Sequence, residues 1–186
     1  MRGVVPQHLA ARFDALNALA PMVTTPEPWK QVTIAAVGGL TGIGFDESAD
    51  LLLAASGAGR GVFDCRTGTL LARDADDEFV FDIGNLLLGG IGPLAGKRVR
   101  MSGIYGGGLA CRTADGWSIE RHPLAWPDDE LILSPPGQSM LWSPPEQPMK
   151  LTKLAGFTSE VRAFGFSPTG QSLVVATAAD ISIFGR

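Results

Sequence analysis

The side chains best suited to chemistry in this chain are acidic, and they gather in two short stretches. The first stretch holds Asp74, Asp76, Asp77 and Glu78, with Asp82 just beyond, and the second follows Trp126 as Asp128, Asp129 and Glu130. The first stretch lacks the ligand spacing of a calcium-binding loop, which leaves a solvated turn or a contact for a basic partner. We predict that both stretches bind a protein partner, with the first as the leading candidate.

Metal and thiol chemistry are poorly represented. His8 and His122 are the only histidines, and no His-x-x-x-His or Cys-x-x-Cys spacing predicts a zinc site. His122 precedes Pro123, which favours a surface or turn position. Cys65 and Cys111 are able to bridge, but nothing in the sequence requires it, and free thiols are the default interpretation.

Two glycine-rich stretches fail the test for nucleotide binding. Residues 38–44 follow an apolar segment, but their glycines are not in the order of a dinucleotide-binding loop, and an acidic turn follows instead of a helix. Residues 103–108 likewise lack the glycine order of a dinucleotide-binding loop. Ser56 is not part of a Gly-x-Ser-x-Gly motif, the nucleophile turn of many hydrolases. The sequence therefore predicts a protein that is not an enzyme and that holds no cofactor and no metal.

Composition favours many short strands joined by turns. The 186 residues include 24 glycines and 13 prolines, which is typical of all-β folds. The formal net charge of −4 argues against nucleic-acid binding and favours a basic partner. The first residues lack the apolar core of a signal peptide, and no apolar run approaches the length of a membrane span. We expect a cytoplasmic protein that does not bind membranes.

The elements that must position these residues are one helix and a series of strands. A helix is predicted over residues 6–20, where Leu9, Phe13, Leu16 and Leu19 form one apolar stripe. This helix is either a cap packed on the body or an exposed partner-binding element. Prolines 21, 26 and 28 then form a stiff connector. Strands are predicted at residues 31–37, 40–45, 51–55, 61–64 and 69–72.

Internal similarity is the strongest signal in the sequence. Phe45-Asp-Glu-Ser-Ala-Asp-Leu-Leu-Leu-Ala-Ala resembles Phe166-Ser-Pro-Thr-Gly-Gln-Ser-Leu-Val-Val-Ala at an offset of 121 residues. Two shorter pairs of segments are also similar. One pair begins at Ser134 and Ser167, at an offset of 33 residues, and the other contains Cys65 and Cys111, at an offset of 46 residues. Degenerate repeats of roughly 40 residues, with insertions, explain these unequal offsets.

The segment from Glu160 to Phe184 resembles a WD40-type repeat, and residues 40–73 resemble a second one. Phe157 stands where that family usually has histidine, and Phe63-Asp64 stands where it often has Trp-Asp. The resemblance implies an all-β fold, a small or incomplete β-propeller of about three to four blades over residues 29–186. Residues 1–28 then form the N-terminal helix and connector. In this family the N-terminal strand commonly completes the last blade, which here implies residues 31–37.

These observations favour a non-catalytic protein–protein interaction module. A specific variant is an immunity protein that neutralises a bacterial toxin by covering its active site. The alternatives are a hydrolase or lyase that uses carboxylates in a central channel, and a structural subunit of a larger assembly. Trp117, Trp126 and Trp142 lie in a proline-rich region, where they serve either as core fillers or as interface residues.

Overall fold

The computed structural model describes residues 7–22, 24–76, 78–122, 130–139, 150–157 and 159–186. The chain divides into two compact units. Unit 1 contains residues 1–26 and 114–156, and unit 2 contains residues 27–113 and 157–186. Within the described residues no helix is long and apolar enough to cross a membrane.

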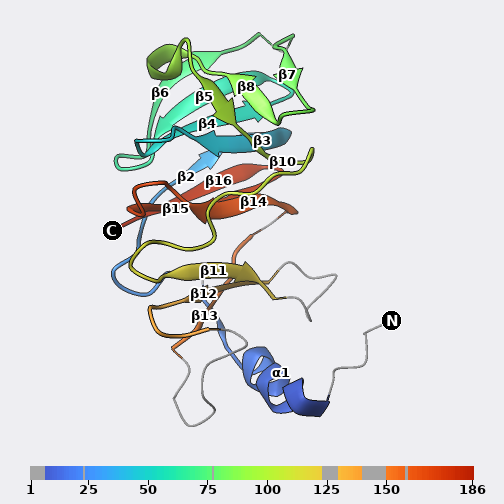
Figure 1. Cartoon of the computed structure of the whole chain (residues 1–186), viewed down its shortest axis with the longest axis vertical. Helices are drawn as coiled ribbons and strands as arrows, with labels where there is room; N and C mark the ends of the chain where they lie inside the picture. The colour runs from blue at the N-terminus through green and yellow to red at the C-terminus, as the bar shows by residue number, and fades with distance from the viewer. Residues whose placement is uncertain (1–6, 23, 77, 123–129, 140–149, 158) are drawn as a thin grey trace. The chain divides into compact units, whose positions relative to one another are not determined.

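Unit 2 contains three sheets (Figure 1). Their orders are β10-β3-β4-β5-β6, β14-β15-β16-β2 and β7-β8-β9. The strands are β2 (Lys30–Ala36), β3 (Leu40–Phe45), β4 (Leu51–Ser56), β5 (Gly59–Asp64), β6 (Thr69–Asp74), β7 (Phe81–Asp82), β8 (Leu87–Gly89), β9 (Arg98–Arg100), β10 (Ser102–Gly103), β14 (Val161–Phe166), β15 (Ser172–Thr177) and β16 (Asp180–Gly185). A single 3₁₀ turn, η2 (Gly92–Leu94), precedes β9.

Burial explains the composition of these strands. β15 is buried along its whole length, and β4 at all but its first residue. Because both faces of these central strands are covered, they are continuous apolar runs rather than alternating ones. β2 and β6 lie at sheet edges and are largely exposed or half-buried. The core that joins the two larger sheets includes Leu52, Phe63, Val174 and Ile183.

The two repeats detected in the sequence have matching hydrogen bonds. The Asp46 amide donates to the Leu51 carbonyl at 2.9 Å, and the Ser167 amide donates to the Ser172 carbonyl at 2.9 Å. These atoms are related by the same offset of 121 residues. Irregularities in pairing occur at 40/42 in β3 and at 161/163 in β14, again with that offset. The predicted internal repeat is therefore a real structural equivalence over residues 40–65 and 161–186.

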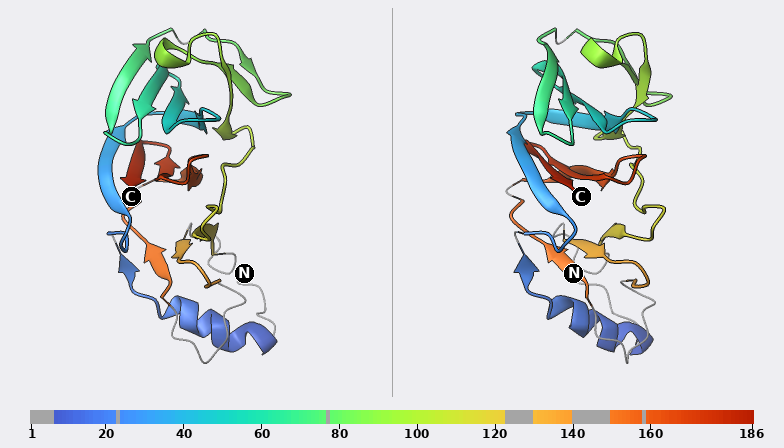
Figure 2. Two further views of the ribbon diagram at one scale, coloured as in Figure 1. Left: turned by 60° about the vertical axis from the view of Figure 1, so that its left-hand side comes forward. Right: turned by 90° about the vertical axis from the view of Figure 1, so that its left-hand side faces the viewer.

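β2 completes the sheet of the second repeat. It pairs antiparallel with β16, with Thr33 opposite Ile183 (Figure 2). In the first repeat β6 pairs with β5 in the same way, and both pairs have a bulge at equivalent positions, after Val62 and after Ile183. The expectation that the strand near residues 31–37 pairs with the last repeat is confirmed.

Glycine at one equivalent position lets a further segment pack against each repeat. A Cβ on Gly44 would lie 2.3 Å from the Arg100 carbonyl oxygen, and one on Gly165 would lie 2.5 Å from the Leu109 Cβ. Gly165 also has a φ of +152°. Because real Cβ atoms do not approach so closely, only glycine allows residues 99–101 and 109–110 to lie where they do.

Unit 1 contains the helix and the fourth sheet, whose order is β1-β13-β12-β11. Its elements are η1 (Gln7–Leu9), α1 (Ala10–Asn17), β1 (Pro21–Met22), β11 (Ser118–Arg121), β12 (Leu131–Ser134) and β13 (Thr152–Leu154). The predicted helix over residues 6–20 is shorter in the structure and begins with a 3₁₀ turn. Leu16 is fully buried with Ile132 and Leu151, so the helix caps this sheet.

The fold class predicted from sequence is confirmed as all-β with one short helix. The described residues form four sheets, none of which closes on itself. A ring of three to four blades therefore stays a prediction. Cys65 is buried and Cys111 is exposed, and the two do not form a disulfide.

Candidate functional site

Asp74, at the end of β6, is held by an arginine of the same sheet. The Arg60 guanidinium donates to the Asp74 carboxylate at 2.5 Å and to the Gly89 carbonyl at 3.0 Å. The Asp76 amide also donates to Asp74, and this bond, followed by that from Arg60, lowers the pKa of the Asp74 carboxyl. Asp74 therefore serves to hold β5, β6 and the turn after them together.

The Asp82 carboxylate is also held by hydrogen bonds, one of them from an arginine. Its carboxylate accepts hydrogen bonds from the side chain and amide of Asn85 and from the Arg98 guanidinium, the last at 2.7 Å. The side-chain bond from Asn85 is the main cause that lowers the pKa of the Asp82 carboxyl. Asp82 thus joins β7 to β9.

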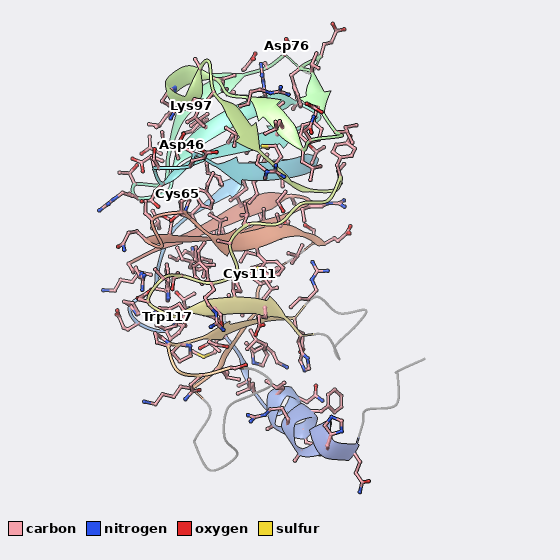
Figure 3. The ribbon with its side chains drawn as sticks, viewed as in Figure 1. Asp46, Cys65, Asp76, Lys97, Cys111 and Trp117 are labelled. Atoms are coloured by element: carbon pink, nitrogen blue, oxygen red, sulfur yellow. The ribbon has the colours of Figure 1, made fainter. Side chains whose placement is uncertain are left out.

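Asp76 and Glu78 are the members of the first stretch whose charge is left for solvent or a partner. Both are exposed, and no described lysine or arginine lies within ion-pair distance of either. The Glu78 amide donates to the Asp76 carboxylate at 2.9 Å, which links these two residues. Asp76 is labelled in Figure 3. Asp77 lies outside the described residues.

The second stretch contributes one described residue. Glu130, in unit 1, pairs with Lys153 of β13 at 3.0 Å. Lys153 is almost fully buried, so this pair neutralises a cation inside unit 1. Trp126, Asp128 and Asp129 lie outside the described residues.

An apolar surface that the sequence did not predict follows the first acidic stretch. Its large side chains are exposed: Val80 by 87%, Ile83 by 55%, Tyr105 by 50% and Ile104 by 45%. The rings of Phe81 and Tyr105 lie 5.2 Å apart, which brings residues 79–83 and 104–105 together. We name the exposed residues Asp76, Glu78, Val80, Ile83, Ile104 and Tyr105 the loop surface.

A groove of about 250 Å³ borders the loop surface. Phe79, Phe81, Met101 and Tyr105 supply its large apolar side chains. Its remaining wall is formed by the first residues of β3, the last residues of β4 and the β10 segment, through Thr41, Gly42, Ala55, Ser56, Gly57, Ser102, Gly103 and Gly106.

Glycine pairing shapes this groove. β10 lies beside β3 with Gly103 opposite Gly42, and a Cβ on Gly103 would lie 2.1 Å from the Thr41 carbonyl oxygen. Gly106 has a φ of +103°, which permits the tight turn that returns the chain to Gly103. The sequence contains this glycine cluster, but only pairing with β3 makes it part of a groove.

The described tryptophans are core residues. Trp29 is 1% exposed and packs on Phe166 in unit 2, and Trp117 is 7% exposed in unit 1. Of the three tryptophans predicted as core or interface, Trp117 therefore belongs to the core. Trp126 and Trp142 lie outside the described residues.

The prediction of a surface or turn position for His122 is wrong. Its side chain is buried and meets the ring of Phe13 edge-on, with centroids 6.1 Å apart. Desolvation lowers the pKa of this imidazole, and the nearby Lys153 lowers it further against the opposing effect of Glu130. The adjacent proline suggested a turn, but the apolar face of α1 covers the ring.

Asp46 and Lys97 form an ion pair within unit 2, and both are labelled in Figure 3. The Lys97 ammonium donates to the nearly buried Asp46 carboxylate at 2.6 Å, and the Ser48 hydroxyl donates at 3.0 Å. The bond from Lys97 is the main cause that lowers the pKa of the Asp46 carboxyl below its usual 3.8. The pair fixes the β3–β4 turn against the segment before β9.

Because the folded-state pKa of Asp46 is depressed, its contribution to stability is present above pH 3.8 and is lost as the pH falls through the folded value. We expect Asp46→Asn to cost about 1 kcal/mol at pH 7, a modest value because Lys97 is half-exposed. This difference should shrink as the pH falls below 3.8 and the Asp46 carboxyl takes up a proton. Urea unfolding of both proteins from pH 2 to 7 measures it, with exposed Glu47→Gln as control. A difference that is independent of pH would contradict this assignment.

The described part of the chain contains no cluster of three or more histidine, cysteine, aspartate or glutamate side chains able to hold a metal ion. No protein-family model matches the sequence, and no curated protein matches it.

Proposed function

We propose that this chain is a WD40-like repeat protein, a small propeller of three to four blades, and that it acts as a non-catalytic module that binds another protein. The observation that carries the proposal is the loop surface, where four large apolar side chains are exposed on two segments that the Phe81–Tyr105 contact brings together, and where two exposed carboxylates precede the first of these segments. Large apolar side chains gathered in one exposed place are typical of protein-binding sites.

The scaffold beneath the loop surface supports this role. Two repeats with matching hydrogen bonds, together with β7 to β10, anchor both segments that carry the loop surface. Binding residues on loops held by a rigid framework lose little conformational entropy on association. Tyr105 is of a residue type enriched among binding hot spots.

The charges of the described carboxyl groups favour binding over catalysis. A hydrolase or lyase that uses a carboxyl as general acid needs a raised pKa. Each carboxyl with a shifted pKa in the described residues, at Asp46, Asp74 and Asp82, is shifted downwards by structural hydrogen bonds. These groups are therefore suited to fixing turns.

The more specific proposal is an immunity protein that covers the active site of a bacterial toxin. The acidic members of the loop surface, Asp76 and Glu78, give it the charge to meet a basic partner, and the net charge of −4 acts in the same direction. Such a partner would be found among the products of neighbouring genes.

Affinity purification of the tagged chain from its native lysate, read by mass spectrometry, tests the proposed function. We expect a stoichiometric partner that is retained by the unmodified chain and reduced at least about tenfold by the triple variant Val80→Ser, Ile83→Ser and Tyr105→Ala. Leu70→Ser with Leu71→Ser, on exposed positions of β6, serves as the matched control. Equal recovery by the triple variant would exclude the loop surface as the binding site.

A further inference from the structure

We infer that the groove beside the loop surface receives one apolar side chain from a partner segment, and that lysine or arginine residues flank this side chain. This inference rests on the proposed function and names the chemistry of its ligand. The observation that carries it is a groove with large apolar side chains whose lining residue Phe79 directly follows the exposed carboxylate of Glu78 in the chain.

The size of the groove favours a single side chain. Its volume of about 250 Å³ lies below the roughly 300–1,000 Å³ of pockets that enclose whole small-molecule ligands. Phe79, Phe81 and Met101 offer an apolar lining, so the inserted group is expected to be an apolar side chain such as that of leucine. Burying such a side chain provides a favourable free energy that charge alone does not.

The glycines around the groove keep it open to a partner side chain. Gly57 and Gly106 are exposed, Gly103 is half-buried, and none of them has a side chain that would narrow the groove. Their amides already donate within the chain, that of Gly57 to the Gly39 carbonyl and those of Gly103 and Gly106 to each other's carbonyl. Binding is therefore expected to depend on the inserted side chain and on charge, not on main-chain hydrogen bonds from these glycines.

The charges beside the groove select a basic segment. Asp74 and Asp82 are neutralised by Arg60 and Arg98, whereas Glu78, next to Phe79 in the groove lining, has no described cationic partner. Asp76, which accepts a hydrogen bond from the Glu78 amide, adds a second carboxylate with no described cationic partner. A partner with lysine or arginine beside its apolar residue therefore gains attraction, and an acidic partner meets repulsion.

Fluorescence anisotropy with the full chain and labelled synthetic peptides tests this inference. The probe has one leucine between two lysine–arginine pairs. The matched peptides replace the leucine with serine, or replace the four basic residues with glutamate. We expect the probe to bind at least about tenfold more tightly than either peptide, and the affinity to fall as salt is raised.

Variants locate the binding to the groove. Tyr105→Ala and Glu78→Lys should each weaken the probe about tenfold or more, and Tyr105→Phe should retain its affinity because the ring is preserved. The controls are Leu71→Ala, at a similarly exposed apolar position, and Glu47→Lys, which makes the same charge change on the β3–β4 turn. Unchanged unfolding midpoints verify that each variant folds.

Equal binding of the leucine and serine peptides would overturn the inference, because it would show attraction by charge alone. Retention of the probe by Tyr105→Ala would overturn it as well. Self-association of the chain that is abolished by Tyr105→Ala would assign the groove to a second copy and likewise overturn it. If the probe fails while the affinity-purified partner still depends on Val80, Ile83 and Tyr105, the inference fails and the proposed function stands.

Discussion

Phe166→Ala is expected to destabilise unit 2 by about 3–5 kcal/mol, which is typical when a buried aromatic side chain is truncated. Phe166 is 1% exposed, and its ring lies 5.4 Å from that of Trp29. The Arg186 guanidinium lies over Trp29, 4.9 Å from its ring centroid. Removal of Phe166 therefore leaves a cavity beside Trp29. Trp29 precedes β2 and contacts Arg186, which follows β16, so its packing joins these two segments.

Denaturant unfolding followed by circular dichroism measures this change. Leu71→Ala, at an exposed position on β6, is the control and should alter the free energy of unfolding by less than about 0.5 kcal/mol. A loss below about 1 kcal/mol for Phe166→Ala would mean that the Trp29–Phe166 packing contributes little to unit 2.

Leu16→Ala is expected to destabilise unit 1 by about 2–5 kcal/mol. Leu16 is fully buried and packs with Ile132 of β12 and with Leu151. An isolated helix of eight residues has little stability in water, so α1 depends on this contact to form. The loss should therefore affect the helix and the sheet it covers together.

Hydrogen exchange read by mass spectrometry resolves this effect within unit 1. Faster exchange is expected in α1, β12 and β13 of Leu16→Ala. Asp14→Ala, on the exposed side of the same helix, should leave exchange in β12 and β13 unchanged. Unaltered protection of those strands in Leu16→Ala would show that the helix is not part of their core, and would favour the exposed, partner-binding interpretation.

Local pattern was sufficient to predict the strands of both repeats. Apolar runs such as Leu51–Ser56 and Ser172–Thr177 are flanked by polar or glycine turns, and the structure has β4 and β15 at these positions. The likeness between the segments that begin at Phe45 and Phe166 reflects the same turn, closed by the same backbone hydrogen bond. Short-range features of this kind are encoded by neighbouring residues, so the sequence reveals them.

The candidate site was predicted less completely. The sequence shows a uniform acidic stretch, whereas in the structure Asp74 and Asp82 are paired with Arg60 and Arg98, and Asp76 and Glu78 are not. Each of these arginines is at least 14 residues from its carboxylate. No local pattern distinguishes a carboxylate that will meet such a partner from one that will not.

The sequence by itself determined an all-β chain with two equivalent repeats, a short N-terminal helix and an excess of acidic residues, because periodicity, turn residues and charge are local properties. Only the tertiary structure decided which exposed side chains lie together. The groove requires β10 to pair with β3 through Gly103 and Gly42, and it requires Phe81 to meet Tyr105 across 24 residues of chain. Such contacts arise from strand pairing between distant segments, and the energy that selects them is distributed over the whole core.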